Sequence, residues 1–164
     1  MIDEAIPFTI RMTTPADVEL LAQQRGAMFL AMGRIQEDEV EPLVKASREW
    51  FQGLIDRNEY VGWYALHGDR IVACGGIHLR DDPPRVGKYY IGRWGHIINI
   101  FTEPEYRRRG LARRMTEIIL DWAEAERLDR VTLTTAPVAR ELYESLGFTA
   151  TADMQLTRKP VSEN

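Results

Sequence analysis

Hydrophobic residues recur along this chain at two spacings, one typical of strands and one typical of helices. Residues 8–13 alternate apolar and polar side chains, with Phe8, Ile10 and Met12 on one side, which predicts a half-buried strand. The longer apolar segments repeat every three or four residues, which predicts helices. The predicted order is β-α-α-β-β-β-α-β-α-β, with strands over 8–13, 60–66, 71–79, 94–102, 130–135 and 148–156 and helices over 15–34, 40–57, 111–127 and 137–146.

Local signals set several of these boundaries. Gly68-Asp69 lies between two predicted strands and is suited to a hairpin turn. The segment 97–101 is almost entirely apolar, as expected of a central strand covered on both faces. Gly147 lies where a helix ends in a left-handed residue, so Phe148 is expected to pack back on Tyr143. The pattern therefore predicts an α/β (α+β) fold with a mixed, mostly antiparallel central sheet and helices on both faces.

Composition limits the function classes. A chain of 164 residues suits one domain, over 1–164, with one core. The formal net charge of -4 disfavours a general nucleic-acid partner, which requires a basic face. No apolar run approaches the roughly 18 residues of a membrane span, no basic and apolar leader begins the chain, and the single cysteine excludes an intrachain disulfide. We therefore expect a cytoplasmic protein without a membrane partner.

Three arginines, Arg107 to Arg109, stand before a helix that is expected to begin at Gly110. Cations at this end oppose the helix dipole and cost about a few tenths of a kcal/mol or more each. An anion would remove the conflict, since the first helical N–H groups lack intrahelical partners and Gly110 leaves room beside the backbone. The pattern favours a phosphate site, although a solvated basic turn is the alternative. Neither a GxxxxGK[ST] nor a GxGxxG motif occurs.

Two motifs in this region resemble those of one family. Arg107-x-x-Gly110-x-Ala112 after an apolar strand resembles the acetyl-CoA motif of the GNAT superfamily of N-acetyltransferases, usually written Q/R-x-x-G-x-G/A. The segment 142–148, Leu-Tyr-Glu-Ser-Leu-Gly-Phe, resembles the family's LYExLGF segment. The resemblance covers 94–156 well and implies the GNAT-like acyl-CoA N-acyltransferase fold, with acetyl-CoA as co-substrate.

The resemblance also implies how the co-substrate is held. Backbone N–H groups from about 108 to 113 would bind the pyrophosphate, and main-chain groups of Ile100 and Thr102 would pair with the pantetheine arm. The strands over 94–102 and 130–135 would run parallel and splay apart to admit the thioester. The cofactor-binding residues implied in this way are Ile100, Phe101, Thr102, Arg107, Arg108, Arg109, Gly110, Leu111, Ala112 and Arg113. We expect no metal, because the histidines lack metal-ligand spacing.

Two residues are candidates for proton transfer. Tyr143 matches the family's general acid, which protonates the departing CoA thiolate, although its helix position also suits a core residue. His96 falls where some family members place a glutamate base, and its pKa near 6.5 suits that task. A histidine that merely fills the strand is the equal alternative, and Glu103 and Glu105 are weaker candidates for the base. An α-amine needs little help, so water can serve as its base.

The acceptor is expected to be a primary amine, in a small molecule or a peptide. By family architecture it would contact the first two helices and the loop before the central strand, where the candidate residues are Phe29, Tyr89, Tyr90 and Trp94. A domain that binds acyl-CoA as a sensor or interaction module, without turnover, would use the same motif. A nucleic-acid-binding protein is the third alternative. Because family members often pair, we also expect a homodimer.

Overall fold

The computed structural model describes residues 7–83 and 92–157. The chain divides into two compact units, Met1–Thr134 and Thr135–Asn164. The first unit contains the sheet and three helices: β1 Thr9–Met12, α1 Val18–Ala31, α2 Val40–Asp56, β2 Tyr60–His67, β3 Arg70–Asp81, β4 Arg93–Thr102, α3 Leu111–Ala125 and β5 Val131–Leu133. The second contains α4, Arg140–Ser145, after a short 3-10 turn. The described elements confirm the predicted order up to the last helix.

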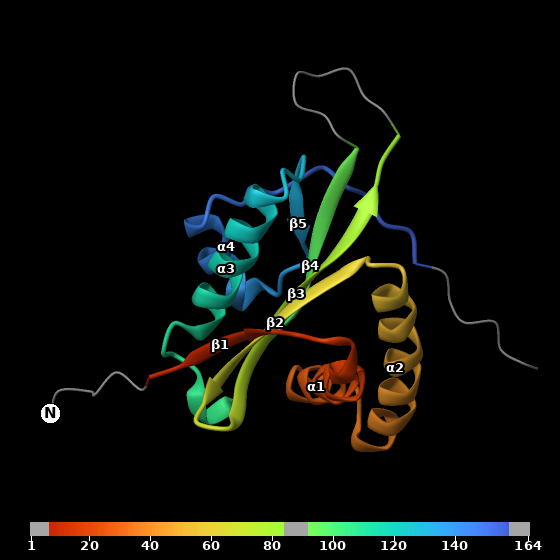
Figure 1. Ribbon diagram of the computed structural model, residues 1–164, viewed down its shortest axis with the longest axis vertical. Coiled ribbons are helices and arrows are strands. Elements are labelled where there is room, and N and C mark those ends of the chain that lie inside the picture. Colours follow the sequence, from red (N-terminus) through yellow and green to blue (C-terminus); the bar gives the residue numbers. More distant parts are fainter. Residues whose placement is uncertain (1–6, 84–91, 158–164) are drawn as a thin grey trace, which may run out of the picture. The chain divides into compact units, whose positions relative to one another are not determined.

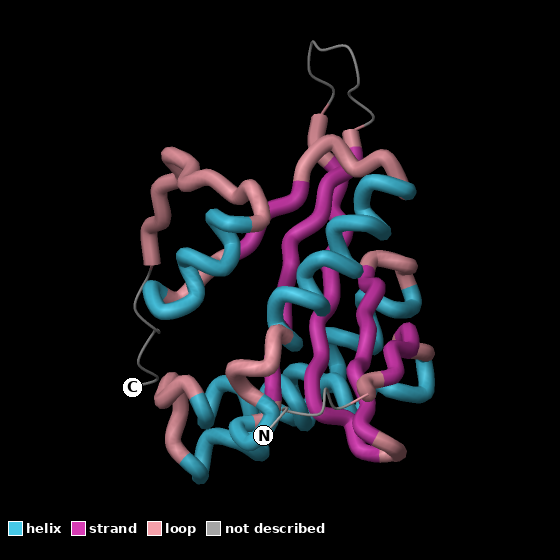
Figure 2. The backbone as a smooth tube through the Cα atoms, turned by 90° about the vertical axis from the view of Figure 1, so that its left-hand side faces the viewer, coloured by secondary structure: helices cyan, strands magenta, loops and turns pink. Residues whose placement is uncertain are grey.

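The five strands form one sheet in the order β1-β2-β3-β4-β5. All neighbours pair antiparallel except β4 and β5, which pair parallel. In Figure 1, α1 and α2 lie on one face of the sheet and α3 lies on the other. Figure 2 shows α3 running along the strands of the sheet. The prediction of a mixed, mostly antiparallel sheet with helices on both faces is therefore confirmed.

Both faces of the sheet are buried, because side chains of the central strands alternate between two cores. Beneath α1 and α2 the core consists of Val18, Leu21, Phe51, Leu54, Tyr60, Tyr64, Cys74 and Phe101. On the α3 face, Trp63 of β2 meets Trp122 of α3 edge to face, with ring centroids 5.8 Å apart. Met115 and Ile119 of α3 are fully buried. This two-sided burial fixes the position of β4, the strand that carries most of the predicted site.

The helix of the second unit, α4, ends as predicted. Gly147 has φ 93°, the Phe148 N–H donates to the Tyr143 carbonyl at 3.1 Å, and the Gly147 N–H donates to the Glu144 carbonyl at 3.0 Å. These two bonds form a Schellman motif. The Phe148 ring also meets the Tyr143 ring edge to face, 5.9 Å between centroids.

The predicted strand over 148–156 is wrong. Its residues alternate apolar and polar side chains, but the structure has no strand there. Met154 and Leu156 are almost fully exposed. Alternation specifies a side for each residue but supplies no partner, and an extended segment without a hydrogen-bonded neighbour is not a strand. Alternation alone is therefore not sufficient for a strand in this segment.

Two glycines make room for one aromatic ring in the core under α1 and α2. The Tyr60 ring lies over Gly62 and Gly76, which face each other across β2 and β3. A Cβ atom at Gly76 would lie 2.2 Å from the Tyr60 hydroxyl oxygen and 2.5 Å from the ring carbon that bears it. The ring has no room to retreat, because Phe51 of α2 packs edge to face against it at 5.1 Å.

We expect Gly76→Ala to destabilise the protein by about 1–3 kcal/mol, the range for overpacking a buried site. Gly53→Ala is the matched control, because Gly53 lies within α2 and its nearest neighbour is the end of the Arg57 side chain. That control should keep or raise stability, since alanine favours helix. Urea unfolding of the three proteins measures both effects. Equal stability of Gly76→Ala and the wild type would contradict this description of the core.

Candidate functional site

A bulge in β4 divides this strand into two parts. Gly76 pairs with Ile98 and Cys74 pairs with Phe101, so two residues of β4 lie opposite the single residue Gly75. The first of them, Asn99, has φ 57° and is 5% exposed. The Cys74 thiol donates a hydrogen bond to the Asn99 carbonyl at 3.2 Å, which supports the irregular backbone. Burial raises the pKa of Cys74 to about 12, so this thiol is not a nucleophile at neutral pH.

Beyond the bulge, no described strand of the first unit pairs with the edge of β4 that lies opposite β3. β5 pairs with β4 in parallel, as predicted, and its partners there are Gly95 to Ile97. This pairing therefore ends before the bulge. Farther along, the Glu103 N–H donates to the Val72 carbonyl of β3 at 2.9 Å. Because successive residues of a strand direct their main-chain groups to opposite edges, the main chain of Thr102 points to the other edge. There the Arg107 Nε donates to the Thr102 carbonyl at 3.1 Å.

The turn after β4 leads directly into α3. Gly110 has φ 78° and is the N-cap of α3, and Arg108 has φ 63°. No hydrogen bond of the described residues uses the backbone N–H of Arg108, Arg109 or Gly110. The first helical bond is donated by the Arg114 N–H to the Gly110 carbonyl at 2.9 Å, so the amides of Leu111 and Ala112 precede it. This helix start therefore gathers unpaired N–H donors at one place, as the sequence predicted.

The arginines of this turn differ in their partners. Arg107, Arg108 and Arg109 are exposed. The Arg109 guanidinium lies 5.9 Å from the centre of the Tyr106 ring. Farther into the helix, Arg113 and Arg114 both lie within 4.0 Å of Glu117. The excess positive charge is thus concentrated before Gly110, beside the unpaired amides.

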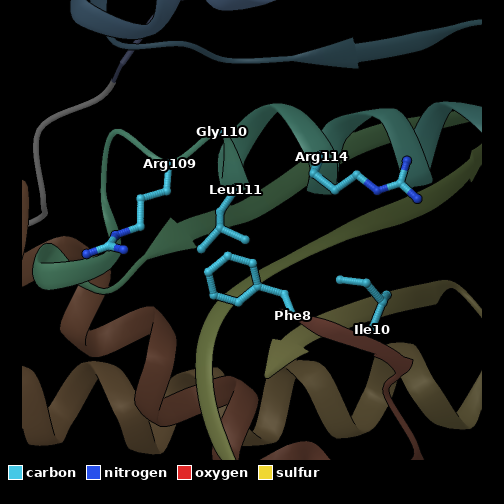
Figure 3. A pocket seen from close by; sticks show the side chains of 6 residues that line it. All are labelled: Phe8, Ile10, Arg109, Gly110, Leu111 and Arg114. Atoms are coloured by element: carbon cyan, nitrogen blue, oxygen red, sulfur yellow. The ribbon is translucent and has the colours of Figure 1, made fainter. Parts of the chain in front are cut away.

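A pocket of about 300 Å³ opens beside the same helix start. Figure 3 shows its lining: Leu111 points toward Phe8, with Ile10 alongside on β1, while the side chains of Arg109 and Arg114 extend away from these three in opposite directions. The apolar side of the first predicted strand therefore lines this pocket, and Ile10 is 37% exposed. Its lining combines apolar walls with guanidinium groups, next to Gly110.

His96 lies in a row of polar side chains that crosses the sheet on the face of α1 and α2. Tyr60, His78, His96 and Thr132 are successive cross-strand partners on β2 to β5, so their side chains share one face. The His96 Nδ1 lies 2.7 Å from the Thr132 hydroxyl oxygen. Burial lowers the pKa of His96, and the nearby Arg80 and His78 lower it further. His96 is therefore neutral at pH 7, as a proton acceptor must be.

The predicted acceptor residues differ in where they lie. Phe29 is half-buried on α1, where the Arg25 guanidinium lies 4.7 Å from its ring centre. Trp94 is two residues before His96 on the same face of β4. The guanidinium carbons of Arg80 and Arg130 lie 5.2 Å and 4.5 Å from the centre of its ring. Its indole N–H also donates to the Asp82 carboxylate at 3.1 Å. Tyr89 and Tyr90 lie outside the described residues.

Tyr143 belongs to the second unit, near the end of α4. Its contact with Phe148 holds the ring, as described above, and burial raises the pKa of its phenol. The phenol therefore keeps its proton at neutral pH, which a general acid requires. Tyr143 can therefore donate a proton at neutral pH, and its role as the general acid stays a prediction.

Sequence reasoning missed two residues of the site. Asn99 and Thr132 gave no signal, because single polar residues in apolar strands are common and their partners come from other elements. The left-handed conformation of Asn99 is also not readable from a strand pattern, although asparagine tolerates it better than most residues. Asn99 and Thr132 become apparent only when the pairing of β4 with β3 and with β5 is known.

Two further findings concern metals and membranes. The described residues contain no group of three or more His, Cys, Asp or Glu side chains placed to hold a metal ion. Among the described helices, none is both long and apolar enough to cross a bilayer. The absence of a metal, the single domain and the homodimer remain predictions.

Comparisons with known proteins agree with this arrangement. Residues 27–148 match the model of the acetyltransferase (GNAT) family. The chain is 30% identical over 95 residues to an uncharacterized N-acetyltransferase, YsnE, of Bacillus subtilis, which is 55% of this chain and 56% of that protein. It is 30% identical over 143 residues to the N-alpha-acetyltransferase RimI of Mycobacterium tuberculosis, covering 87% of this chain and 78% of that protein. The chain thus spans about half the length of the Bacillus protein.

Solved structures show the same fold. A GCN5-related N-acetyltransferase from Ralstonia eutropha aligns with a TM-score of 0.81 at 22% identity, covering 96% of this chain and 100% of that one. A predicted acetyltransferase from Clostridium acetobutylicum, solved with acetyl-CoA, aligns with a TM-score of 0.79 at 25% identity, covering 93% and 96%. The family model matches well over half of the chain, and the helix start after β4 agrees with it. This chain therefore belongs to the acetyltransferase (GNAT) family.

Proposed function

We propose that this protein transfers an acetyl group from acetyl-CoA to a primary amine. The observation that carries the proposal is the start of α3, where unpaired amides and three arginines stand next to the open edge of β4. The family match and the relative solved with acetyl-CoA support the same co-substrate.

The helix start fits a diphosphate. A negative charge there would meet the amides of Arg108 to Ala112 and relieve the repulsion of Arg107 to Arg109 by the helix dipole. Each charge-assisted hydrogen bond contributes about 1.5–3 kcal/mol, so three would supply much of the roughly 8 kcal/mol of a micromolar complex. Leu111 and Phe101 are buried and would contribute through their main chains. Arg113 would add positive charge from the first turn of α3.

The open edge of β4 fits an extended, amide-containing arm. The main chain of Thr102 points to this edge, and by alternation so does that of Ile100. The Thr102 carbonyl already accepts a hydrogen bond from Arg107. We therefore assign the hydrogen bonds to the pantetheine arm to the Thr102 N–H and to the main chain of Ile100. In this role Arg107 positions the end of the strand as well as contributing charge.

The reaction needs a proton acceptor on the amine side. A new bond forms between the amine nitrogen and the acetyl carbonyl carbon, the carbon–sulfur bond breaks, and the amine loses a proton. Deprotonating a lysine-like amine at pH 7 costs about 4–5 kcal/mol. We assign this proton to His96, which is neutral at pH 7, shares the sheet face of α1 and α2, and is fixed by Thr132. Trp94, on the same face of the sheet, and Phe29, on the helix α1 that covers this face, would contact the acceptor.

The sulfur side needs a proton donor. We assign this role to Tyr143, because it occupies the tyrosine position of the family segment 142–148 and keeps its proton at neutral pH. The phenol would give its proton to the departing thiolate and recover one from water. A sensor or interaction module that binds acetyl-CoA without turnover is the alternative function, and release of free thiol across a panel of amines separates the two.

The charge of residue 110 should decide how tightly acetyl-CoA binds. Gly110→Asn and Gly110→Asp add side chains of nearly equal shape, both tolerant of a left-handed backbone, and no atom lies within 4 Å of the position of the new Cβ. We expect the aspartate to raise the Kd for acetyl-CoA about tenfold or more over the asparagine variant. Isothermal titration calorimetry measures this ratio. Equal Kd values for the two variants would end the assignment of the diphosphate to this helix.

The pH dependence of kcat/KM should report His96. A base acts only when neutral, so activity is lost as pH falls through its pKa, which lies below the ordinary 6.5 in the folded protein. Rates corrected for the fraction of neutral amine should therefore fall on the acid side of pH 6.5. His96→Gln should lose about 100-fold in kcat/KM and flatten this limb.

His78→Gln is the matched control for the pH experiment. His78 lies opposite His96 and its pKa is also lowered by burial, but the proposal gives it no proton to carry. Its removal takes one positive charge away from His96, so the acid limb should move toward 6.5 and persist. If the limb disappeared in His78→Gln and persisted in His96→Gln, the base would be misassigned.

Replacing the phenol should slow turnover without weakening acetyl-CoA binding. We expect Tyr143→Phe to lower kcat about 100-fold with an unchanged Kd. The defect should shrink when the acyl donor carries a thiol of lower pKa, since such a thiolate leaves without a proton. Tyr64→Phe, which changes a buried core hydroxyl without a hydrogen-bond partner, should keep wild-type activity. A Tyr143→Phe enzyme with full kcat would make Tyr143 a packing residue.

A further inference from the structure

An arginine on α1 is held beside the bulge of β4. Arg25 is half-buried, and its Nη1 donates to the Asn99 side-chain oxygen at 2.9 Å. Its guanidinium carbon lies 4.7 Å from the centre of the Phe29 ring and 5.8 Å from the centre of the Trp50 ring. Two aromatic rings and one neutral amide therefore fix this cation in place.

Arg25 has no acidic partner among the described residues. Other arginines on or near α1 and α2 do: Arg11 of β1 pairs with Asp17, Arg48 of α2 with Glu19, and Arg57 at the end of α2 with Glu59. Of the five N–H groups of a guanidinium, the structure uses one in Arg25. A half-buried cation without an anion is costly, and burial lowers the pKa of Arg25 accordingly.

The surroundings of Arg25 add an unpaired donor, and an acid near them is already paired. The Asn99 side-chain nitrogen, on the same amide that holds Arg25, is buried without a hydrogen-bond partner. His78 meets the Trp50 ring edge to face at 5.5 Å, and Arg80 follows two residues later on β3. Glu59, which is paired with Arg57, is the acid whose charge reaches His78. This part of the sheet face thus favours a bound anion.

Asn99 connects Arg25 to the site of the proposed reaction. It is the bulge residue of β4, three positions after His96. Three residues of a strand span about 10 Å. An anion held by Arg25 would therefore lie within the reach of one small molecule from the proposed base.

We propose that Arg25 binds a carboxylate carried by the acceptor, so that the acceptor class is an amine that is also a carboxylic acid. This inference rests on the proposed acetyl transfer. Stacking on two rings leaves the edge of the guanidinium free, and this edge matches the two oxygens of a planar carboxylate. A single arginine with one matching edge fits a carboxylate better than a phosphate, which takes several cationic partners.

Matched acceptors test the inference directly. Thiol release from acetyl-CoA is measured for amino acids whose amine and carboxylate are separated by one to five carbons. Each is compared with its carboxamide and with its phosphonate, and rates are corrected for the neutral amine. We expect the best carboxylate to exceed its carboxamide by about 10- to 100-fold in kcat/KM.

Variants show whether Arg25 causes the preference. Arg25→Gln should lower kcat/KM for the carboxylate about 10- to 100-fold and leave the carboxamide nearly unchanged, so that the ratio falls toward one. Arg25→Lys should retain part of the preference, since it keeps the charge without the planar edge. Arg48→Gln, which removes an exposed arginine of α2, should keep the wild-type ratio. Thermal unfolding and the Kd for acetyl-CoA verify that each variant is folded.

The outcomes separate this inference from the proposed function. Acetylation that treats carboxylate and carboxamide alike, prefers the phosphonate, or keeps its preference in Arg25→Gln overturns the carboxylate site and leaves acetyl transfer intact. If acetyl-CoA binds but no amine releases thiol, acetyl transfer fails. The amino acids are then titrated into the CoA-bound protein while the Trp50 indole N–H signal is followed by NMR. Shifts with carboxylates that vanish in Arg25→Gln support the site, and their absence overturns it.

Discussion

The structure depends on one irregular position in an otherwise regular strand. At Asn99 the backbone of β4 turns left-handed, two residues face the single residue Gly75, and the Cys74 thiol supports the carbonyl that leaves the ladder. Before this point β4 pairs with β3 on one edge and, from Gly95 to Ile97, with β5 on the other; beyond it β5 no longer follows. Burial of both faces of the sheet keeps β4 in place regardless, so the free edge is rigid. A rigid free edge can bind an extended molecule without first paying the entropy of ordering a loop.

The same strand delivers the chain to the start of α3 in a conformation that few residues adopt. Arg108 and Gly110 both have positive φ, and the intervening turn leaves several amides without acceptors. For a non-glycine residue such a backbone costs on the order of 1–3 kcal/mol. Backbone strain, unpaired N–H donors and adjacent arginines each raise the free energy of this turn. A bound polyanion would offset both the unpaired donors and the repulsion of the arginines. The helix start would therefore be more stable with the proposed diphosphate bound than without it.

The sequence predicted the parts of this arrangement that local periodicity and motif spacing encode. The central strand, the hairpin at Gly68, the helix beginning after Gly110 and the left-handed end at Gly147 all follow from residues within one turn or strand. Partners distant in sequence could not be predicted in this way. The segment 148–156 has the alternation of a strand but no strand to join, and Arg25 is separated from Asn99 by 74 residues. His96 was placed on the central strand by the sequence, whereas its sheet face and its contact with Thr132 required the register of β4 with β3 and β5.

The two halves of the proposed site differ in what holds the ligand. On the α3 side the donors are main-chain amides, whose positions depend on the course of the backbone and hardly on side-chain identity. On the α1 and α2 side the polar groups are side chains, and each depends on a few others: Arg25 on Asn99 and two rings, His96 on Thr132. Substitutions can therefore alter the acceptor side without disturbing the donor side. In the proposed site, specificity for the amine would therefore be set by side chains of α1, of α2 and of the sheet face that these helices cover.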